Sequence, residues 1–326
     1  MTNKKRISLL FKLIIGIASF SIIYWRLKND FTSEQITLLK ENLLANNAYL
    51  YIGISVLLFP LNWAMESYKW KLITAQTEKI SFSRAQKSVY AGICVGNLAP
   101  GRATEFLAKI HFFKPENRIA ITVLHFINGM FQLSITIVVG ILSLVFSSNL
   151  NAEKSATLNT VAICLSLAVG LLFIISILKI NKLIGWVYKK TTKGKEQNVA
   201  QIKWSASLLS ALFLISMARY IVFATQFYLL IAVFNPTANF MQLFSSIGAY
   251  FLLTTIIPMF SLIEAAVRAA IALVVFSGIG ISNPALALIA VLLWLINIVM
   301  PSIVGYFVLL KENLSLASFK LKNRKE

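Results

Sequence analysis

The stretch "GNLAPGRATEFLAK", residues 96–109, lies inside a long apolar segment and determines the predicted fold. It carries five residues that a membrane helix rarely has next to one another: Pro100, Gly101, Arg102, Glu105 and Lys109. Proline and glycine interrupt a helix. Charged side chains at membrane depth are costly, and they usually mark a functional site. The stretch therefore predicts a broken membrane helix with a function at the break.

The composition is that of a membrane protein. Of 326 residues, 58% are hydrophobic and 13% are charged, whereas about 25% of residues are charged in a soluble domain. Several continuous apolar runs are long enough to cross a bilayer as helices. They do not alternate with period two, which excludes a β-barrel. We expect an all-α polytopic protein with a single integral membrane domain, residues 1–326, in the bacterial inner membrane.

The charge pattern and the small number of metal-binding side chains argue against a nucleic-acid-binding protein and a metalloprotein. The chain has 31 Lys and Arg against 12 Asp and Glu, but no basic and aromatic pattern of the kind that binds RNA. We therefore expect no nucleic-acid partner and assign the basic residues to cytoplasmic loops. Cys94 and Cys164 lie far apart in apolar segments, and the chain has only two histidines. We expect no disulfide, no metal centre and no cofactor.

The distribution of basic residues predicts the topology. Lysine and arginine precede the first apolar run, follow the second and fourth, and fill the C-terminal tail, so both termini are expected in the cytoplasm. The predicted full spans are residues 7–25, 48–70, 117–147, 157–178, 204–234 and 284–310. The first has no small-residue cleavage site and is expected to be retained. Between the first two, a Thr32-x-x-Gln35 capping box predicts an amphipathic helix, about 32–46, on the outer membrane surface.

Two further apolar segments are interrupted. Residues 82–113 are broken at "NLAPG" and flanked by basic residues, whereas residues 240–277 are broken at "TTIIPMFS" and have uncharged flanks. If each segment crossed the membrane, one flank of each would violate the positive-inside bias. We therefore predict two re-entrant hairpins, the first entering from the cytoplasm and the second from outside. The fold is then six full spans plus two re-entrant broken hairpins.

The two broken segments match each other. Pro100 follows Phe82 at the same spacing at which Pro258 follows Phe240. The further matched positions are Glu105 with Glu264 and Lys109 with Arg268. A kink and an intrahelical ion pair explain each feature alone, but two matched breaks favour a repeat. The half-repeats, about 48–147 and 204–310, would form an inverted repeat, in which the substrate site lies near the midplane.

The break itself is a candidate anion site. The second arm of a hairpin begins inside the membrane, where its free N–H groups attract anions. We expect the arms to begin at Gly101 and Met259. Gly101 would permit a close backbone approach, and Arg102 would add a planar fork suited to phosphate oxygens. With Asn97, these residues would form an anion cradle over residues 97–102.

Other polar residues within the spans are further candidates for substrate contacts. Arg219, inside "ALFLISMARYIVFATQF", is the strongest of them. The others are Glu66 (one helical turn after Asn62), Gln132, Gln226, Glu105, Glu264, Lys109 and Arg268. Lys109 is expected to lie near the cytoplasmic interface, which makes it weaker than Arg102. The alternative for each is interhelical hydrogen bonding, which we favour for His125, Asn128 and Asn297.

These motifs resemble a known family. "GNLAPGRATEFLAK" is similar to the Pro-Gly-Arg-x-x-Glu motif of the lysylphosphatidylglycerol synthase transmembrane family, also called flippase-like proteins. "IPMFSLIEAAVRAA", residues 257–270, resembles its second motif, although many members have glycines where this chain has residues 259–263. "NWAMESYKW" and "ARYIVFATQF" also resemble the family, and the similarity covers about residues 5–312.

The resemblance implies a lipid translocase or lipid-handling protein whose partner is a membrane lipid in the bilayer. Arg102 and Arg219 would engage a phosphate, while Glu105 and Glu264 would hold the cations or meet an amine. No synthase domain follows in this sequence, so we do not expect aminoacyl-lipid synthesis. The sequence has no phosphate-binding loop for ATP and no catalytic set, which indicates a transporter rather than an enzyme. The alternatives are a secondary transporter of a small soluble anion, a lipid-modifying enzyme, or an accessory subunit of lipid or glycan synthesis. The oligomeric state is not indicated.

The topology can be tested by labelling single cysteines from the outside of cells, in a background without Cys94 and Cys164. We expect no labelling at positions 79 and 114, and labelling at positions 235–239 and 277–283, because only the last two regions lack basic residues. Labelling at positions 79 and 239 but not at position 114 would contradict the two hairpins.

Overall fold

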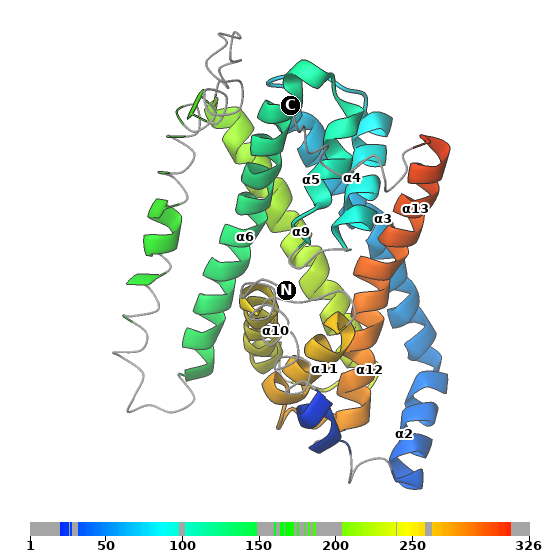
Figure 1. Cartoon of the computed structure of the whole chain (residues 1–326). Coiled ribbons are helices and arrows are strands. Elements are labelled where there is room, and N and C mark those ends of the chain that lie inside the picture. The colour runs from blue at the N-terminus through cyan, green and yellow to red at the C-terminus, as the bar shows by residue number, and fades with distance from the viewer. Residues whose placement is uncertain are drawn as a thin grey trace, which may run out of the picture. The chain divides into compact units, whose positions relative to one another are not determined.

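The computed structural model describes residues 20–25, 27, 32–97, 102–148, 204–238, 240–257 and 263–313, with isolated positions between 160 and 186. Within these ranges the chain is helical apart from turns and short connections, and no strand occurs there. Figure 1 shows the helices in order along the chain. The prediction of an all-α fold is confirmed for the described residues.

Four helices are long and apolar enough to cross a membrane. They are α3 (Asn46–Thr74), α6 (Arg118–Ser148), α9 (Ala206–Ala232) and the continuous run of α12 (Asn283–Trp294), the π-helical turn η5 (Leu295–Val299) and α13 (Met300–Lys311). Each corresponds to one predicted span. The predicted spans 7–25 and 157–178 lie largely outside the described residues.

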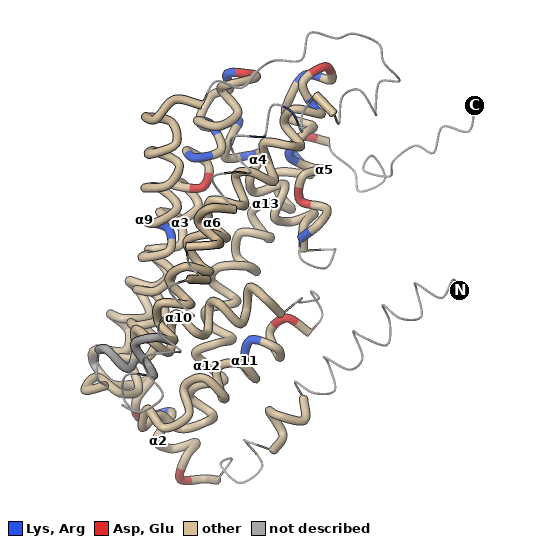
Figure 2. Tube along the Cα trace, turned by 90° about the vertical axis from the view of Figure 1, so that its left-hand side faces the viewer, with Lys and Arg blue, Asp and Glu red and all other residues tan. Residues whose placement is uncertain are grey.

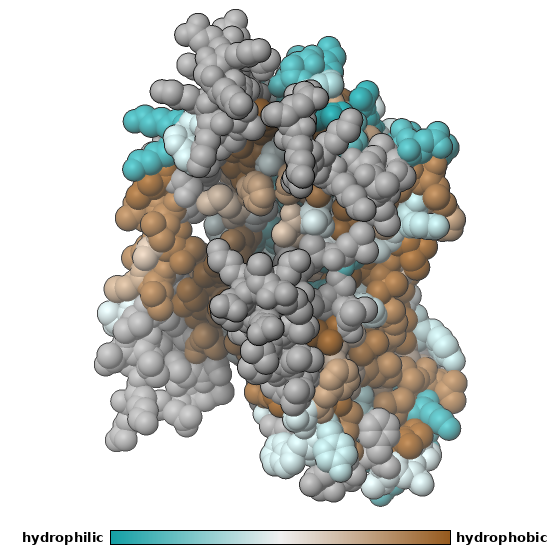
Figure 3. All heavy atoms as spheres, in the orientation of Figure 1, coloured by the Kyte–Doolittle hydropathy of each residue, from teal (hydrophilic) through white to brown (hydrophobic). Residues whose placement is uncertain are grey.

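The surface of these helices is apolar, as an integral membrane protein requires. Large hydrophobic side chains are strongly exposed along them, for example Leu57 at 72%, Leu214 at 64% and Phe307 at 62%. Hydrophobic residues also make up much of the coloured surface in Figure 3. Exposed apolar side chains in such numbers are stable in lipid but not in water.

The amphipathic segment after the first span is helix α2 (Ser33–Leu44). The Thr32 hydroxyl accepts a hydrogen bond from the Gln35 amide at 3.3 Å, so the predicted N-cap is confirmed. Apolar side chains such as Ile36 and Leu44 are exposed on this helix. Its location on a membrane surface stays a prediction.

Contacts divide the chain into two units, which are described separately. The first unit comprises Met1–Pro60, Thr136–Val169 and Tyr220–Asn297, and the second comprises Leu61–Ile135, Gly170–Arg219 and Ile298–Glu326. Each unit contains one of the two broken segments.

In the second unit, the first broken segment folds back as a hairpin of α4 (Phe82–Gly96), α5 (Glu105–Lys109) and the 3-10 turn η2 (Ile110–Phe112) (Figure 1). A β-carbon on Gly96 would lie 3.0 Å from Glu105 Cβ, and one on Gly92 would lie 2.8 Å from Lys109 Cγ. Further back along α4, Arg84 Nε donates a hydrogen bond to the Phe112 carbonyl at 2.7 Å. Residues later in the second arm thus contact residues earlier in α4, so the two arms run antiparallel and form a hairpin. The predicted break is confirmed.

The second arm of this hairpin does not begin at Gly101, as predicted, but at Glu105. Arg102 has φ +57°, a left-handed conformation that few residues other than glycine adopt, and α5 begins three residues later. The Thr104 hydroxyl then donates a hydrogen bond to the Val95 carbonyl at 2.7 Å, which holds the turn against α4. Pro100 and Gly101 themselves lie outside the described residues.

In the first unit, the second broken segment forms α10 (Phe240–Ile256) and α11 (Glu264–Val275), which pack in one hydrophobic core. Phe227 of α9 stacks on Phe276, with ring centroids 4.8 Å apart. Helix α11 begins at Glu264, so the prediction of a start at Met259 is wrong. The hinge residue Pro258 lies outside the described residues.

Each unit contains a very close approach of two helices at a glycine. In the second unit, a β-carbon on Gly305 of α13 would overlap the Tyr90 carbonyl of α4 and lie 2.9 Å from Cys94 Cβ. In the first unit, a β-carbon on Gly140 of α6 would lie 2.6 Å from Leu252 Cβ and 3.1 Å from the Gly248 carbonyl oxygen of α10. Only glycine allows helix backbones to approach this closely.

We expect Gly305→Ala to destabilise the protein by about 1–3 kcal/mol, because the added methyl group must displace a backbone carbonyl. The matched control is Gly129→Ala on α6, where an added β-carbon meets no atom within 4 Å. That change should be neutral or stabilising by up to about 1 kcal/mol, because alanine favours the helix. Thermal unfolding in detergent checks the pair, and equal melting temperatures would disprove the close contact.

Candidate functional site

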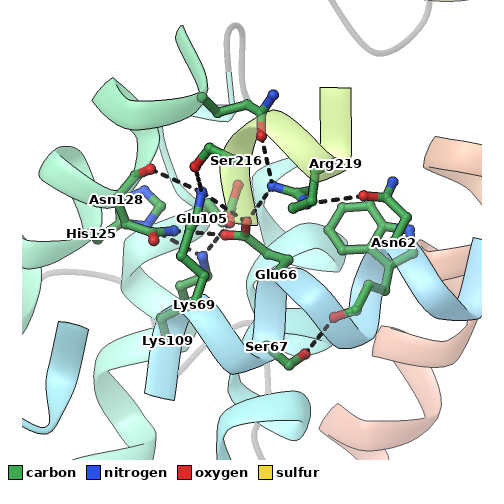
Figure 4. A network of polar contacts seen from close by, with 12 residues as sticks. Asn62, Glu66, Ser67, Lys69, Glu105, Lys109, His125, Asn128, Ser216 and Arg219 are labelled. Atoms are coloured by element: carbon green, nitrogen blue, oxygen red, sulfur yellow. Dashed lines mark hydrogen bonds and ion pairs between the residues drawn. The ribbon is translucent and has the colours of Figure 1, made fainter. Parts of the chain in front are cut away.

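Charged side chains gather in the second unit. Figure 2 shows coloured charged positions around α4 and α5, and Figure 4 shows the polar contacts among the buried ones. We call this set the charge cluster: Asn62, Glu66 and Lys69 of α3, Glu105 and Lys109 of α5, His125, Asn128 and Gln132 of α6, and Ser216 and Arg219 of α9, with Arg102 just before α5. It brings most of the predicted site residues of this unit together.

The Glu66 carboxylate is the centre of the charge cluster. Its Oε2 forms a short ion pair with Arg219 Nη1 and a second ion pair with Lys69 Nζ at 3.3 Å. Its Oε1 accepts a hydrogen bond from Asn128 Nδ2 at 2.7 Å. Glu66 is buried, and a buried carboxylate is stable only when its oxygens are paired in this way.

The two cations beside Glu66 also make further hydrogen bonds. Arg219 Nε donates to Asn62 Oδ1 at 2.9 Å, and Nη1 donates to Gln132 Oε1 at 3.3 Å. Lys69 Nζ donates to the Asn128 carbonyl at 3.2 Å and to Ser216 Oγ at 3.1 Å. The buried cations thus connect α9 to α3 and α6 within this unit.

Lys109 forms the second part of the charge cluster. Its Nζ lies 2.6 Å from Glu105 Oε1, 3.4 Å from His125 Nδ1 and 4.9 Å from the centre of the Trp70 ring. An ammonium group only donates, so a hydrogen bond between these two groups requires the tautomer in which His125 Nδ1 accepts. Lys109 is 1% exposed, so its ammonium group does not reach the surface of the protein, and its depth in the membrane stays a prediction. The return of α5 along α4 carries it inward, into the space left by Gly92.

Arg102 completes the charge cluster. It is half-buried and interacts electrostatically with Glu105 and Arg219. The cluster therefore holds four cations, Lys69, Arg102, Lys109 and Arg219, and two carboxylates, Glu66 and Glu105, a net charge of 4 − 2 = +2. An excess of buried positive charge favours the binding of an anion.

The predicted anion cradle over residues 97–102 lies largely outside the described residues and stays a prediction. Glu105 lies in the first turn of α5, and its carboxylate pairs with Lys109. Asn97 caps the end of α4 and donates to Ser302 Oγ of α13.

The remaining candidates lie in the first unit. Arg268 Nε and Nη2 both donate to Glu264 Oε1, at 3.1 and 2.9 Å, so the predicted ion pair is confirmed, as is the pair of Glu105 with Lys109. Gln226 donates to the Ser55 carbonyl at 2.8 Å and accepts from Asn297 Nδ2 at 3.0 Å. The hydrogen bonding between helices expected for Asn297 is confirmed, and Gln226 shares it.

Lys69 is the functional candidate that the sequence analysis missed. Its position near the end of a span gives it the appearance of a cytoplasmic anchor, yet it is fully buried beside Glu66. The available signal is the spacing Glu66-x-x-Lys69 within an apolar helix, because residues three apart lie on one helix face.

The chain matches the family described as Lysylphosphatidylglycerol synthase TM region over residues 10–305, and it belongs to this family. The match agrees with the apolar spanning helices and with the motif at residues 96–109. No curated protein matches the chain.

We expect Glu66→Gln to destabilise the protein by about 3–5 kcal/mol, because Lys69 and Arg219 would lose their common counter-charge in an apolar interior. The control is Glu312→Gln, which removes an ion pair with Lys87 whose side chains are 33% and 41% exposed. That change should cost about 0–1 kcal/mol. Unfolding of both variants in detergent measures the difference, and a loss no larger for Glu66→Gln would contradict the central role of its carboxylate.

Proposed function

We propose that this protein is a lipid translocase, which moves the anionic or zwitterionic head group of a membrane lipid through its helical bundle. The observation that carries the proposal is the charge cluster, in which cations outnumber carboxylates within apolar helices. Buried charges in a membrane protein are costly and mark substrate pathways. Membership of the family fits a membrane domain that handles lipids.

The proposal includes six full spans and two re-entrant hairpins arranged as an inverted repeat, with half-repeats about 48–147 and 204–310. The helix boundaries support it. Helices α4 and α10 begin at Phe82 and Phe240, and α5 and α11 begin at Glu105 and Glu264. The number of residues between the starts of α4 and α10 equals that between the starts of α5 and α11 to within a single residue. Both second arms thus start at the glutamate of a matched Glu-x-x-x-cation pair.

The glycine contacts support the repeat independently. Gly305 meets the Tyr90 carbonyl and Cys94 Cβ, and Gly140 meets the Gly248 carbonyl and Leu252 Cβ. The shift along the chain that carries Phe82 onto Phe240 also carries Tyr90 onto Gly248 and Cys94 onto Leu252. The two glycines lie equally far along the chain from the first residues of their helices, Arg118 and Asn283. In each case one hairpin packs on the last helix of the other half-repeat.

Within this architecture the side chains have separate tasks. Arg102, which is half-buried, would meet a phosphate first, and Lys109 and Arg219 would attract it inward. Glu66 and Glu105 neutralise these cations while no lipid is bound. Glu264 and Arg268 would form the matching pair of the second half-repeat. The sequence has no phosphate-binding loop for ATP, so an ion gradient or the lipid gradient would supply the energy.

The distribution of basic residues indicates the orientation of the protein in the membrane. We place the protein in the bacterial inner membrane with both termini in the cytoplasm, because the terminal segments are basic. A secondary transporter of a small soluble anion would use the same cations, so the test must include such an anion.

Transport of labelled phosphatidylglycerol between the leaflets of proteoliposomes tests the proposal. We expect Arg102→Gly to reduce the rate at least about tenfold, since a charge-assisted hydrogen bond is lost. Glycine relieves the left-handed strain at φ +57°, so this variant should be at least as stable as the native protein. Arg102→Lys should retain part of the rate, and Arg219→Ala should lose it.

The controls separate the alternatives. Glu312→Gln, in the exposed ion pair, should transport normally. Uptake of labelled inorganic phosphate without movement of lipid would favour the soluble-anion transporter. Normal lipid transport by both Arg102→Gly and Arg219→Ala would reject the role of the charge cluster.

A further inference from the structure

We propose that Asn62 and Trp63 of α3 form, with Arg219, a seat for one phosphate oxyanion. The inference rests on the proposed function and names further residues that bind the head group. Asn62 is 0% exposed and Trp63 is 4% exposed. Within the described part of the chain, neither Asn62 Nδ2 nor Trp63 Nε1 has a hydrogen-bond partner. Buried N–H groups are nearly always paired, so two orphans on consecutive residues call for an acceptor from outside the chain.

Both orphan donors belong to side chains that contact the same guanidinium group. Arg219 Nε donates to Asn62 Oδ1 at 2.9 Å, which fixes the orientation of the amide and leaves Nδ2 as the unused donor. The Trp63 ring lies 5.6 Å from Arg219 Cζ. Figure 4 shows Asn62 extended toward Arg219, with Glu66 on the neighbouring side of the guanidinium.

The chemistry of the seat selects an oxyanion. An indole N–H donates and cannot accept, and the remaining amide N–H of Asn62 also only donates. Arg219 and Lys69, which both pair with Glu66 Oε2, add positive charge to this part of the cluster. A ligand cation would be repelled, and a neutral ligand would gain nothing from the charge. A phosphate ester oxygen accepts several hydrogen bonds and benefits from the positive charge.

The seat occurs in only one half-repeat. The shift that relates the two hairpins carries Asn62 and Trp63 to Tyr220 and Ile221, neither of which could supply the same donors. We therefore infer one phosphate seat in each chain rather than two equivalent ones. A lipid phosphate and free phosphate share the required chemistry, and the experiment must separate these two sources.

The test measures binding of labelled phosphatidylglycerol and of inorganic phosphate to purified protein in detergent. Trp63→Phe keeps an aromatic ring beside Arg219 but removes the N–H donor. Asn62→Asp keeps the acceptor for Arg219 Nε and replaces the donor with negative charge. The matched control is Trp294→Phe, because Trp294 Nε1 of α12 is another buried indole N–H without a partner in the described part of the chain.

We expect Trp63→Phe to weaken binding of phosphatidylglycerol about tenfold, Asn62→Asp to weaken it further, and Trp294→Phe to have no effect. Binding of a glucosyl lipid without phosphate should not change in any variant. Unchanged phosphatidylglycerol affinity in both Trp63→Phe and Asn62→Asp would overturn the seat. Melting temperatures identify a variant that fails to fold. If one of the two seat variants fails, the binding affinity of the other one tests the seat.

The two phosphate sources and the two proposals give different outcomes. If the native protein binds inorganic phosphate but no phosphatidylglycerol, and the two seat variants weaken that binding, the seat is supported and a lipid head group is overturned as its occupant. If the seat variants bind phosphatidylglycerol more weakly than the native protein, but the native protein moves no lipid in proteoliposomes, the seat is supported and the translocase is rejected. Failure of the seat with normal lipid transport rejects this inference alone.

Discussion

The Glu66 carboxylate, shared by Arg219 and Lys69, is the interaction on which the second unit depends. In water such ion pairs contribute little, because both charges are well solvated. Inside an apolar bundle the alternative to pairing is an isolated buried charge, whose cost is several times larger. Three side-chain amides orient these charged groups. Asn128 donates a hydrogen bond to Glu66, and Asn62 and Gln132 accept hydrogen bonds from Arg219. The cluster is thus a rigid, preorganised set of charges.

Local features of this cluster could be predicted from the sequence, whereas its assembly could not. Glu105 with Lys109 and Glu264 with Arg268 are four residues apart, and helix geometry alone brings them together. Proline and glycine likewise indicate the break directly. The pair of Glu66 with Arg219 joins residues far apart in the sequence and depends on how α3 packs against α9. The role of Lys69 could not be predicted for the same reason, since only packing distinguishes a buried lysine from a loop anchor at the end of a span.

The position of the helix starts changes the chemistry assigned to the break. A proline followed by glycine predicts that the new helix begins at once, which would direct its N–H groups toward a ligand. Arg102 is left-handed and α5 begins only at Glu105, whose carboxylate pairs with Lys109. Arg102 retains a strained conformation that an arginine seldom adopts, and such strain persists where the surrounding structure requires the side chain at that position.

The proposed repeat duplicates the packing and the Glu-x-x-x-cation pairs, but not the charges around Glu66. The glycine contacts of Gly140 and Gly305 recur with matched partners, yet the shift that relates those partners carries Glu66 onto Ala224. The first unit instead joins α3, α9 and η5 through the neutral hydrogen bonds of Gln226 and Asn297. Neutral bonds of this kind hold membrane helices together without the cost of buried charge. A second charge cluster would add that cost again. Among the described residues, the first unit therefore keeps its ion pair of Glu264 with Arg268 but avoids a second buried centre like Glu66.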